Sequence, residues 1–255
     1  MMPLHADFLR LPIAHRALHD RAAGRPENSC EAIAAAVAAG YAIEIDIQPA
    51  ADGVPMVFHD YDLRRLTGVP GRIAGLTSGK LGALRLCGGD TGIPTLAEVL
   101  RIVAGRVPLL VEIKDQDGAL GPRVGALERA VAQVLAEYSG PVAVMSFNPH
   151  SVAAFHAAAP EIPVGLTTSA YRPEDWGLIP AATRDRLREI PDYATLDACF
   201  VSHEAGDLDR ARIAELRQAG AAILCWTIRS PEAEAEARRI ADNVTFEGYP
   251  AGLPA

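Results

Sequence analysis

Short, mostly apolar stretches alternate with longer stretches of mixed character along almost the whole chain. Eight of the short stretches predict β-strands, at 11–14, 42–47, 108–113, 142–146, 163–168, 198–202, 221–227 and 243–246. Most of the segments between them have the length of a helix. An α/β chain of 255 residues in which eight strands alternate with helices predicts a (β/α)8 or TIM barrel. A doubly wound open sheet is the alternative.

Helix signals support this alternation. At residues 28–39, Asn28 followed three positions later by Glu31 predicts a capping box, and Gly40 ends the apolar pattern. Residues 123–138 place apolar side chains at helical spacing. Further helices are predicted from Thr95 onward, at 208–219 and at 231–241.

One connection departs from the repeat. After the second predicted strand, Asp52 and Gly53 form a turn signal, and residues 54–58 predict a short strand that folds back as a hairpin. Residues 60–92 are then turn-rich and irregular. Because long loops inside a compact domain are usually functional, we expect this insertion to cover the mouth of the active site. No linker interrupts residues 1–255, so we expect a single domain.

Composition and charge narrow the functional classes. The chain is 49% hydrophobic and carries a formal net charge of −8, so it repels nucleic acid and anionic membrane surfaces. We therefore expect no nucleic-acid partner, and an anionic substrate needs a local positive site. The first residues lack a signal-peptide pattern, and no stretch of about 20 apolar residues is present to span a membrane. These features predict a cytoplasmic protein without a membrane span, and they leave the oligomeric state unknown.

The cysteines carry a second constraint. Cys30, Cys87, Cys199 and Cys225 stand singly, without a CxxC pair. This spacing argues against a zinc cluster and against a disulfide framework. We expect all four to be buried thiols.

Polar residues collect at the ends of the predicted strands, where the active site of a (β/α)8 barrel lies. The first three strands end in polar pairs: His15 with Arg16, Glu44 with Asp46, and Glu112 with Lys114. His59 and Asp60 follow the hairpin. The second half of the chain offers Ser146 and Trp226, and we expect His203 to be a loop residue outside the site.

Glu44 and Asp46 raise an electrostatic problem. Two residues apart on a strand, they point to the same face about 6.6 Å from each other, while three isoleucines take the other face. At an effective dielectric constant of about 20, their repulsion is roughly 2 to 3 kcal/mol. A bound cation would offset it. Three carboxylates, with Glu112 as the third, suit Mg²⁺ or Ca²⁺ better than zinc.

The remaining polar residues suit a phosphodiester. The guanidinium of Arg16 and the ammonium of Lys114 are suited to phosphate. His15 and His59 can share general acid and general base catalysis. A metal, a phosphate clamp and two histidines together predict a phosphodiesterase. A protein that binds a phosphodiester without cleaving it is the non-enzymatic alternative, although none of these roles lacks a residue.

Several motifs carry a resemblance to a known family. They are IAHR at 13–16, PENS at 26–29, EIDI at 44–47, DGVPMVFHDYDLRRLTG at 52–68, IPTLAEVL at 93–100 and LLVEIK at 109–114, with a fainter CWTI at 225–228. With these motifs the sequence resembles the glycerophosphodiester phosphodiesterase family. The resemblance implies a TIM barrel and a small-molecule phosphodiester substrate that is cleaved to glycerol 3-phosphate and an alcohol, in lipid and glycerol metabolism.

The same resemblance implies roles for individual residues. It makes His15 and His59 catalytic, gives a divalent cation (Mg²⁺ or Ca²⁺) to Glu44, Asp46 and Glu112, and gives the phosphate to Arg16 and Lys114. Glu27, Asn28 and Trp226 are candidates for the substrate pocket.

The sequence also departs from the family pattern. Ala17 stands where glycine is usual, Ser29 where threonine is usual, and residues 246–250 replace a common Thr-Asp before the last proline. These departures bear on which substrate is bound more than on the type of reaction. The alternative is therefore a sphingomyelinase D-like or lysophospholipase D-like enzyme, since those enzymes share the barrel, the two histidines and the metal carboxylates.

Overall fold

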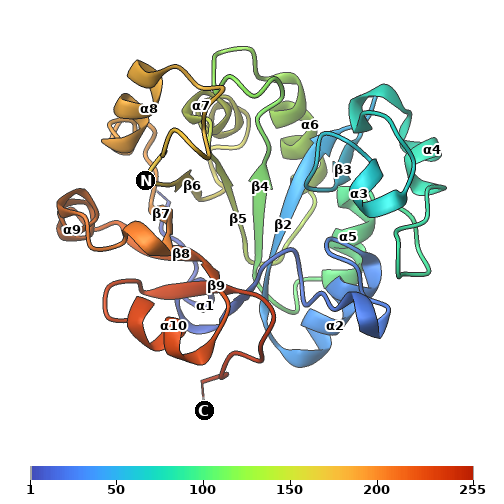
Figure 1. Ribbon diagram of the computed structural model, residues 1–255, viewed down its shortest axis with the longest axis horizontal. Coiled ribbons are helices and arrows are strands. Elements are labelled where there is room, and N and C mark those ends of the chain that lie inside the picture. The colour runs from blue at the N-terminus through green and yellow to red at the C-terminus, as the bar shows by residue number, and fades with distance from the viewer. Residues whose placement is uncertain (1, 255) are drawn as a thin grey trace.

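The computed structural model describes residues 2–254. Eight parallel strands close into a barrel, because β1 pairs with both β2 and β9, and helices surround it (Figure 1). This closure is the predicted (β/α)8 architecture and excludes the open sheet. A ninth strand, β3, runs antiparallel to β2 and forms the predicted hairpin. The strands are β1 Ile13–Ala14, β2 Ala42–Pro49, β3 Pro55–Val57, β4 Leu109–Ile113, β5 Val142–Ser146, β6 Val164–Thr168, β7 Phe200–Glu204, β8 Ala222–Ile228 and β9 Asn243–Phe246.

Helices connect most successive barrel strands on the outside. Thr95 caps α5, the helix predicted from this residue onward, through a reciprocal exchange of hydrogen bonds with Glu98. The α-helices are α1 Asp7–Arg10, α2 Cys30–Ala39, α3 Arg64–Thr67, α4 Ser78–Gly82, α5 Leu96–Val103, α6 Ala126–Leu135, α7 Pro149–Ala158, α8 Ala181–Arg188, α9 Ala211–Gln218 and α10 Pro231–Ala237. Short 3-10 helices are η1 Arg21–Ala23, η2 Ile73–Gly75 and η3 Ala205–Asp207.

Two local expectations were wrong. Helix α2 is capped by the hydroxyl of Ser29, which accepts a hydrogen bond from the Ala32 N–H, so Asn28 lies outside the helix. His203 lies on β7 and is fully buried, not in a loop. Its Nδ1 lies 2.8 Å from the Thr168 hydroxyl, and its Nε2 lies near the carboxylate of Asp207, so the strand can bury the ring with its polar atoms satisfied.

A cluster of apolar side chains, called the apolar plug below, fills the barrel interior towards the N-terminal ends of the strands. Inward-facing side chains of several strands pack together there, and Phe8 of α1 is part of the same cluster. Phe200 occupies this interior because its neighbour on β6 is Gly165, where a Cβ atom would lie 2.4 Å from the phenyl ring. The pocket described below therefore has a closed floor.

The insertion has a small core of its own. Residues 60–92 carry α3, η2 and α4, and lie beside β2, β3 and α5 (Figure 1). Leu63, Leu66, Ile73 and Leu81 bury their side chains against Met56 and other residues of this cluster. The short helices thus depend on tertiary packing.

Two findings bear on the cysteines and on membranes. All four cysteines are free, but Cys30 and Cys87 are half-buried, so the expectation that all would be buried was wrong for these two. Among the described residues, no helix combines the length and the apolar character that crossing a bilayer requires.

Candidate active site

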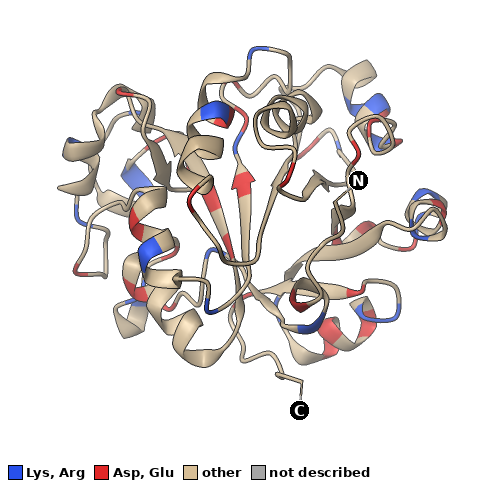
Figure 2. Cartoon of the chain, turned by 180° about the vertical axis from the view of Figure 1, so that it is seen from behind, with Lys and Arg blue, Asp and Glu red and all other residues tan. Residues whose placement is uncertain are grey.

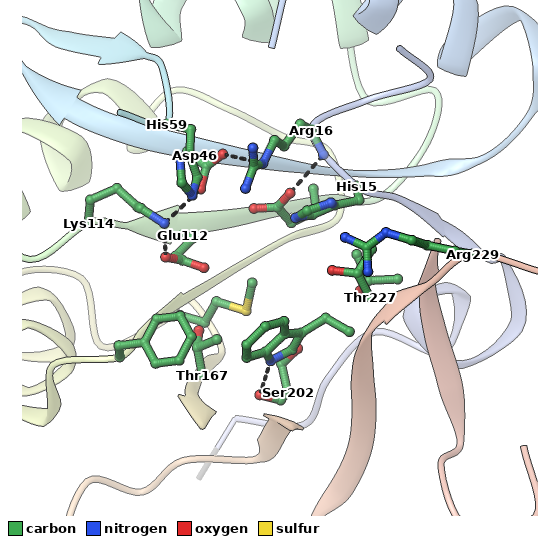
Figure 3. A pocket seen from close by; sticks show the side chains of 15 residues that line it. His15, Arg16, Asp46, His59, Glu112, Lys114, Thr167, Ser202, Thr227 and Arg229 are labelled. Carbon is green, nitrogen blue, oxygen red and sulfur yellow. Dashed lines mark hydrogen bonds and ion pairs between the residues drawn. The ribbon is translucent and has the colours of Figure 1, made fainter. Parts of the chain in front are cut away.

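A pocket of about 180 Å³ opens at the C-terminal ends of the barrel strands. The residues predicted to be catalytic, to bind metal or to bind phosphate all line it: His15, Arg16, Glu44, Asp46, His59, Glu112 and Lys114. Trp226 lines it as well, whereas Glu27 and Asn28 lie behind it. Figure 3 shows Arg16, Asp46, His59, Glu112 and Lys114 gathered on one side of the pocket, with Thr167 and Ser202 on the opposite side and Arg229 beside Thr227. The indole N–H of Trp226 donates to the backbone carbonyl of Ser202.

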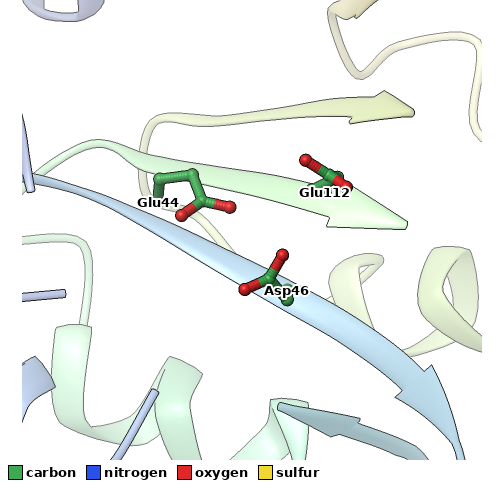
Figure 4. A group of neighbouring side chains, drawn as sticks. All are labelled: Glu44, Asp46 and Glu112. Atoms are coloured by element: carbon green, nitrogen blue, oxygen red, sulfur yellow. The ribbon is translucent and has the colours of Figure 1, made fainter. Parts of the chain in front are cut away.

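Three buried carboxylates form a cluster on β2 and β4 (Figure 4). Each of Glu44, Asp46 and Glu112 offers an oxygen within 4.8 Å of the others. Figure 2 shows acidic segments on these two neighbouring strands inside the barrel, whereas most other charged positions lie on the outer helices and loops. A set of oxygen donors without sulfur fits a hard divalent cation.

The cluster is not uniformly charged. Burial, with the neighbouring Asp46 and Glu112 carboxylates, raises the pKa of Glu44 well above its usual value and so favours its protonated form. Burial opposes the ionisation of Asp46, but Lys114, His59 and Arg16 outweigh it and hold the Asp46 pKa well below its usual range. The Lys114 ammonium lies 2.7 Å from Glu112 and 3.1 Å from Asp46.

His15 is held by a carboxylate from the far end of the chain. Its Nδ1 lies 2.6 Å from Oε2 of Glu247, and the other oxygen of Glu247 accepts a hydrogen bond from Nε of Arg229 at 2.8 Å. Because an ionised carboxylate can only accept, Nδ1 carries the proton and Nε2 remains available to a substrate. Burial lowers the pKa of His15, although its hydrogen bond to Glu247 opposes this shift.

His59 has the same kind of support. Its Nδ1 lies 2.8 Å from Oδ1 of Asp60, whose two oxygens are held by the guanidinium of Arg65 at 2.6 and 2.9 Å. Both pocket histidines thus use Nδ1 for a carboxylate that an arginine clamps. In each case the imidazole is oriented and its Nε2 is left free of these contacts.

Glu27 and Asn28 brace the site from behind. Glu27 accepts a hydrogen bond from Nη1 of Arg16 at 2.8 Å. The Nδ2 of Asn28 donates to Oδ2 of Asp46 at 2.9 Å. The shift of the helix cap to Ser29 makes this contact possible, because it leaves the Asn28 side chain free to reach β2.

The turn after β1 is left-handed at Arg16 and Ala17, which have φ values of 51° and 66°. This conformation directs the backbone N–H of Arg16 to Oε2 of Glu44 at 2.8 Å. Ala17 occupies a φ region that favours glycine, which is the residue usual at this position in the resembled family.

The opposite wall combines aromatic rings with hydroxyls. Phe147 and Trp226 pack edge to face with centroids 5.5 Å apart. The hydroxyls of Thr167, Ser202 and Thr245 are buried and line the pocket, and they have no hydrogen-bond partner within residues 2–254. They are available to polar groups of a ligand.

Sequence reasoning missed Glu247, Arg65 and the supporting contact of Asp60. Glu247 lies in the unusual ending after β9, and that departure from the family pattern was the available signal. Arg65 lies within the motif at 52–68, one of two adjacent arginines, and nothing in the local pattern distinguishes it from Arg64.

Comparison with known proteins gives consistent results. A protein of Bacillus altitudinis named glycerophosphodiester phosphodiesterase is 31% identical over 152 residues, or 56% of this chain, and the matched region spans 61% of that relative's length. The structure of an Oleispira antarctica phosphodiesterase in complex with the product sn-glycerol-3-phosphate has a TM-score of 0.77 and 25% identity, covering 95% of this chain and 94% of that chain.

A glycerophosphodiester phosphodiesterase of Parabacteroides distasonis has the same fold, with a TM-score of 0.74 at 22% identity, covering 93% of this chain and 92% of its own. Residues 15–245 match the sequence profile of the glycerophosphoryl diester phosphodiesterase family, and this range includes every pocket residue named above. The chain belongs to the glycerophosphoryl diester phosphodiesterase family.

Proposed function

We propose that this protein hydrolyses glycerophosphodiesters to glycerol 3-phosphate and an alcohol, with the help of a divalent cation. One observation carries the proposal: two carboxylate-supported histidines line the same pocket as a three-carboxylate cluster and two basic residues. The related Oleispira antarctica enzyme was solved with sn-glycerol-3-phosphate, and this supports the same product here.

The histidines move the protons. Nε2 of one histidine removes a proton from the attacking oxygen, which belongs to water or to a neighbouring hydroxyl of the substrate. That oxygen forms a bond to phosphorus as the bond to the leaving alcohol breaks. When water attacks, this step gives glycerol 3-phosphate directly; when the substrate hydroxyl attacks, it gives a cyclic phosphate, which one water then opens to glycerol 3-phosphate. The other histidine delivers a proton to the leaving oxygen, so protons and charge balance over the step. Each such transfer contributes roughly 10² to 10⁴ in rate.

The charged groups bind and neutralise the phosphate. Glu44, Asp46 and Glu112 would hold Mg²⁺ or Ca²⁺, which supplies Lewis-acid stabilisation of charge on the phosphoryl oxygens when bound. Arg16 and Lys114 line the same wall, so the guanidinium and the ammonium are placed to contact the phosphate. Trp226 and Phe147 offer an aromatic surface to the alcohol group.

Two observations bear on the cellular compartment and on the size of the substrate. The cysteines of the described chain are all free, which suits a reducing compartment such as the cytoplasm. A small polar diester suits a pocket of about 180 Å³ with a closed floor better than a lipid with acyl chains does.

A substrate panel tests the proposal. The purified protein, supplied with Mg²⁺ or Ca²⁺ in turn, is assayed on glycerophosphocholine, glycerophosphoethanolamine, lysophosphatidylcholine and sphingomyelin. We expect glycerol 3-phosphate from the first two substrates. Turnover of the long-chain lipids alone would move the assignment to the lysophospholipase D-like alternative, and phosphodiester binding without turnover of any diester would favour the non-catalytic one.

Two alanine variants assign the proton-transfer roles. His15→Ala and His59→Ala are compared on glycerophosphocholine and on bis(4-nitrophenyl) phosphate, whose aryl leaving group needs no proton. The variant that keeps activity on the aryl ester while losing it on the choline ester has lost the general acid. Near-normal kcat of either variant on both substrates would remove that histidine from the mechanism.

A further inference from the structure

Arg65 makes four hydrogen bonds to two carboxylates, although nearly half of its side chain is exposed and it does not line the pocket. Its Nε and Nη2 hold Asp60 at 2.6 and 2.9 Å. Its Nη1 and Nη2 hold Glu27, both at 2.7 Å. Each of two edges of the planar guanidinium therefore donates two parallel hydrogen bonds to one carboxylate. An ammonium group cannot reproduce this geometry.

Each of these carboxylates also holds a pocket residue. Oδ1 of Asp60 contacts Nδ1 of His59 at 2.8 Å, and Oε1 of Glu27 contacts Nη1 of Arg16 at 2.8 Å. Both of these oxygens also accept from Nη2 of Arg65. The hydrogen bonds therefore run without a break from Arg16 through Glu27, Arg65 and Asp60 to His59.

We propose that Arg65 is a positioning residue that fixes Arg16 and His59 relative to each other across the site. Resting on the functions proposed above for these two residues, the inference links the phosphate anchor to a proton-transfer group through α3 of the insertion. The contacts explain how a segment outside the pocket wall contributes to its geometry. They also assign separate effects to the two arms of this hydrogen-bond chain. The Glu27 arm, which leads to Arg16, acts on phosphate binding, and the Asp60 arm, which leads to His59, acts on proton transfer.

Kinetics of four variants test this assignment. Glu27→Gln should mainly raise KM, because Arg16 loses its brace, and Asp60→Asn should mainly lower kcat through His59. Arg65→Ala should do both and lower kcat/KM about ten- to hundredfold, the usual effect of losing a partner that orients a functional side chain. Arg65→Lys keeps the charge without the double fork, so we expect it to remain within about threefold of Arg65→Ala.

Two controls separate positioning from folding. Arg64→Ala removes the same charge from the same helix, and the Arg64 side chain makes no hydrogen bond or ion pair to another described residue. Its kcat and KM should match those of the wild type. Guanidinium chloride at millimolar concentration should restore several-fold activity to Arg65→Ala, because the position is open to solvent, and should restore none to Arg65→Ala combined with Asp60→Asn and Glu27→Gln.

Clear results would overturn the inference. It fails if Arg65→Ala behaves like Arg64→Ala, if Arg65→Lys recovers wild-type kinetics, or if Arg65→Ala lowers activity by its full factor in the Glu27→Gln, Asp60→Asn background. A loss of activity that follows a loss of thermal stability and does not respond to guanidinium also counts against it.

The test stands apart from the question of substrate. A wild type that cleaves no glycerophosphodiester would refute the proposed substrate, and kinetics would then use bis(4-nitrophenyl) phosphate. If no diester is cleaved, calorimetric binding of inorganic phosphate tests the Glu27 arm. Arg65→Ala and Glu27→Gln should weaken this binding equally, and unchanged affinity in both would contradict the role of Arg65.

Discussion

Glu44 and Asp46 lie two residues apart on one strand, yet their surroundings give them opposite charge states. Burial and two neighbouring carboxylates raise the pKa of Glu44, against the opposing effect of the backbone N–H of Arg16, and so favour its protonated form. Asp46 receives the amide of Asn28 and lies near Lys114 and Arg16, which keep it ionised. The buried ammonium of Lys114 thus offsets the repulsion expected from the sequence, and the raised pKa of Glu44 lowers it further.

Cation binding should therefore release a proton. Because the pKa of Glu44 is raised, we expect the binding of Mg²⁺ or Ca²⁺ to release a proton from it. Affinity should rise with pH until Glu44 is ionised in the free protein. Titration calorimetry in buffers of different ionisation enthalpy measures the release. Glu44→Gln should bind the ion more weakly and release no proton, whereas equal release by the wild type and this variant would contradict the assignment.

The same shift has a consequence for stability. A carboxyl with a raised pKa in the folded state contributes fully to the free energy of unfolding below its unfolded pKa, and this contribution is lost as pH rises through the folded value. The metal-free protein should therefore lose stability on the alkaline side of the usual Glu range. Glu44→Gln should remove this pH dependence in chemical unfolding experiments.

Glu247→Gln should impair His15 without removing it. The amide cannot accept and orient the Nδ1–H as the carboxylate does, so kcat should fall about ten- to hundredfold. Glu247 raises the pKa of His15 against the effect of burial. In the variant, the limb of the pH–rate profile that reports the ionisation of His15 should therefore shift to lower pH. Glu236→Gln, on the exposed face of α10, is the control. An unchanged pH profile with unchanged kcat would show that Glu247 does not act on His15.

Six of the seven pocket residues expected to be catalytic or to bind metal or phosphate could be predicted because parallel strands place their carboxyl ends at one rim. The seventh, His59, follows the antiparallel strand β3, which the hairpin folds back along β2. Glu247 could not be predicted, since it is separated from His15 by 232 positions and acts through side-chain geometry that no local pattern records. Arg65 and Glu27 illustrate the same limit. Their sequence neighbourhoods fit an exposed ion pair equally well.

At the scale of elements, strands were easier to predict than helix ends. β5 and β9 begin and end where predicted, because strands covered on both faces are rich in apolar and β-branched residues. The start of α2 depends on a one-residue choice between two good capping residues, Asn28 and Ser29, and the contact with Asp46 decides it. Helices α3 and α4 are too short to leave a periodic pattern and are stabilised by their packing.

Gly165→Ala should destabilise the barrel. The added methyl group would meet the ring of Phe200, and overpacking of this kind costs typically 1 to 3 kcal/mol in the free energy of unfolding. Urea unfolding measures the change. Gly79→Ala in α4, where a Cβ meets nothing within 4 Å, is the matched control and should be neutral or slightly stabilising. Recovery in a Gly165→Ala, Phe200→Leu double variant would identify the ring as the cause, and equal stability of the two glycine variants would exclude it.

The whole molecule presents a pocket with a polar wall above an apolar plug. If the hydroxyls of Thr167, Ser202 and Thr245 bind hydroxyl groups of the substrate, removing one should raise KM for glycerophosphocholine about two- to tenfold, the range of a single neutral hydrogen bond. Thr167→Val, Ser202→Ala and Thr245→Val preserve shape closely enough for this comparison. Turnover of bis(4-nitrophenyl) phosphate, which lacks hydroxyls, should stay unchanged. Equal effects on both substrates would assign these residues to packing.

Chelation should separate activity from folding. We expect EDTA to abolish turnover of the wild type and Mg²⁺ or Ca²⁺ to restore it. The melting temperature of the metal-free wild type should stay close to that of the untreated wild type. Lys114→Met is the informative variant, because it leaves Asp46 and Glu112 without their ammonium partner. Its metal-free form should melt well below the metal-free wild type and gain more from added ion. Full activity after verified metal removal would contradict the cation's role.

The buried ammonium of Lys114 also bears on the order of assembly. It lies within 3.1 Å of Asp46 and Glu112, and Nε of Arg16 lies 3.6 Å from Asp46, so two cations offset the charge of these two carboxylates before any ion arrives. If the cluster binds a cation as proposed, we expect a newly made chain to complete its barrel first and to acquire its ion afterwards. Chains folded without metal would then form a reserve that gains activity once the ion is supplied.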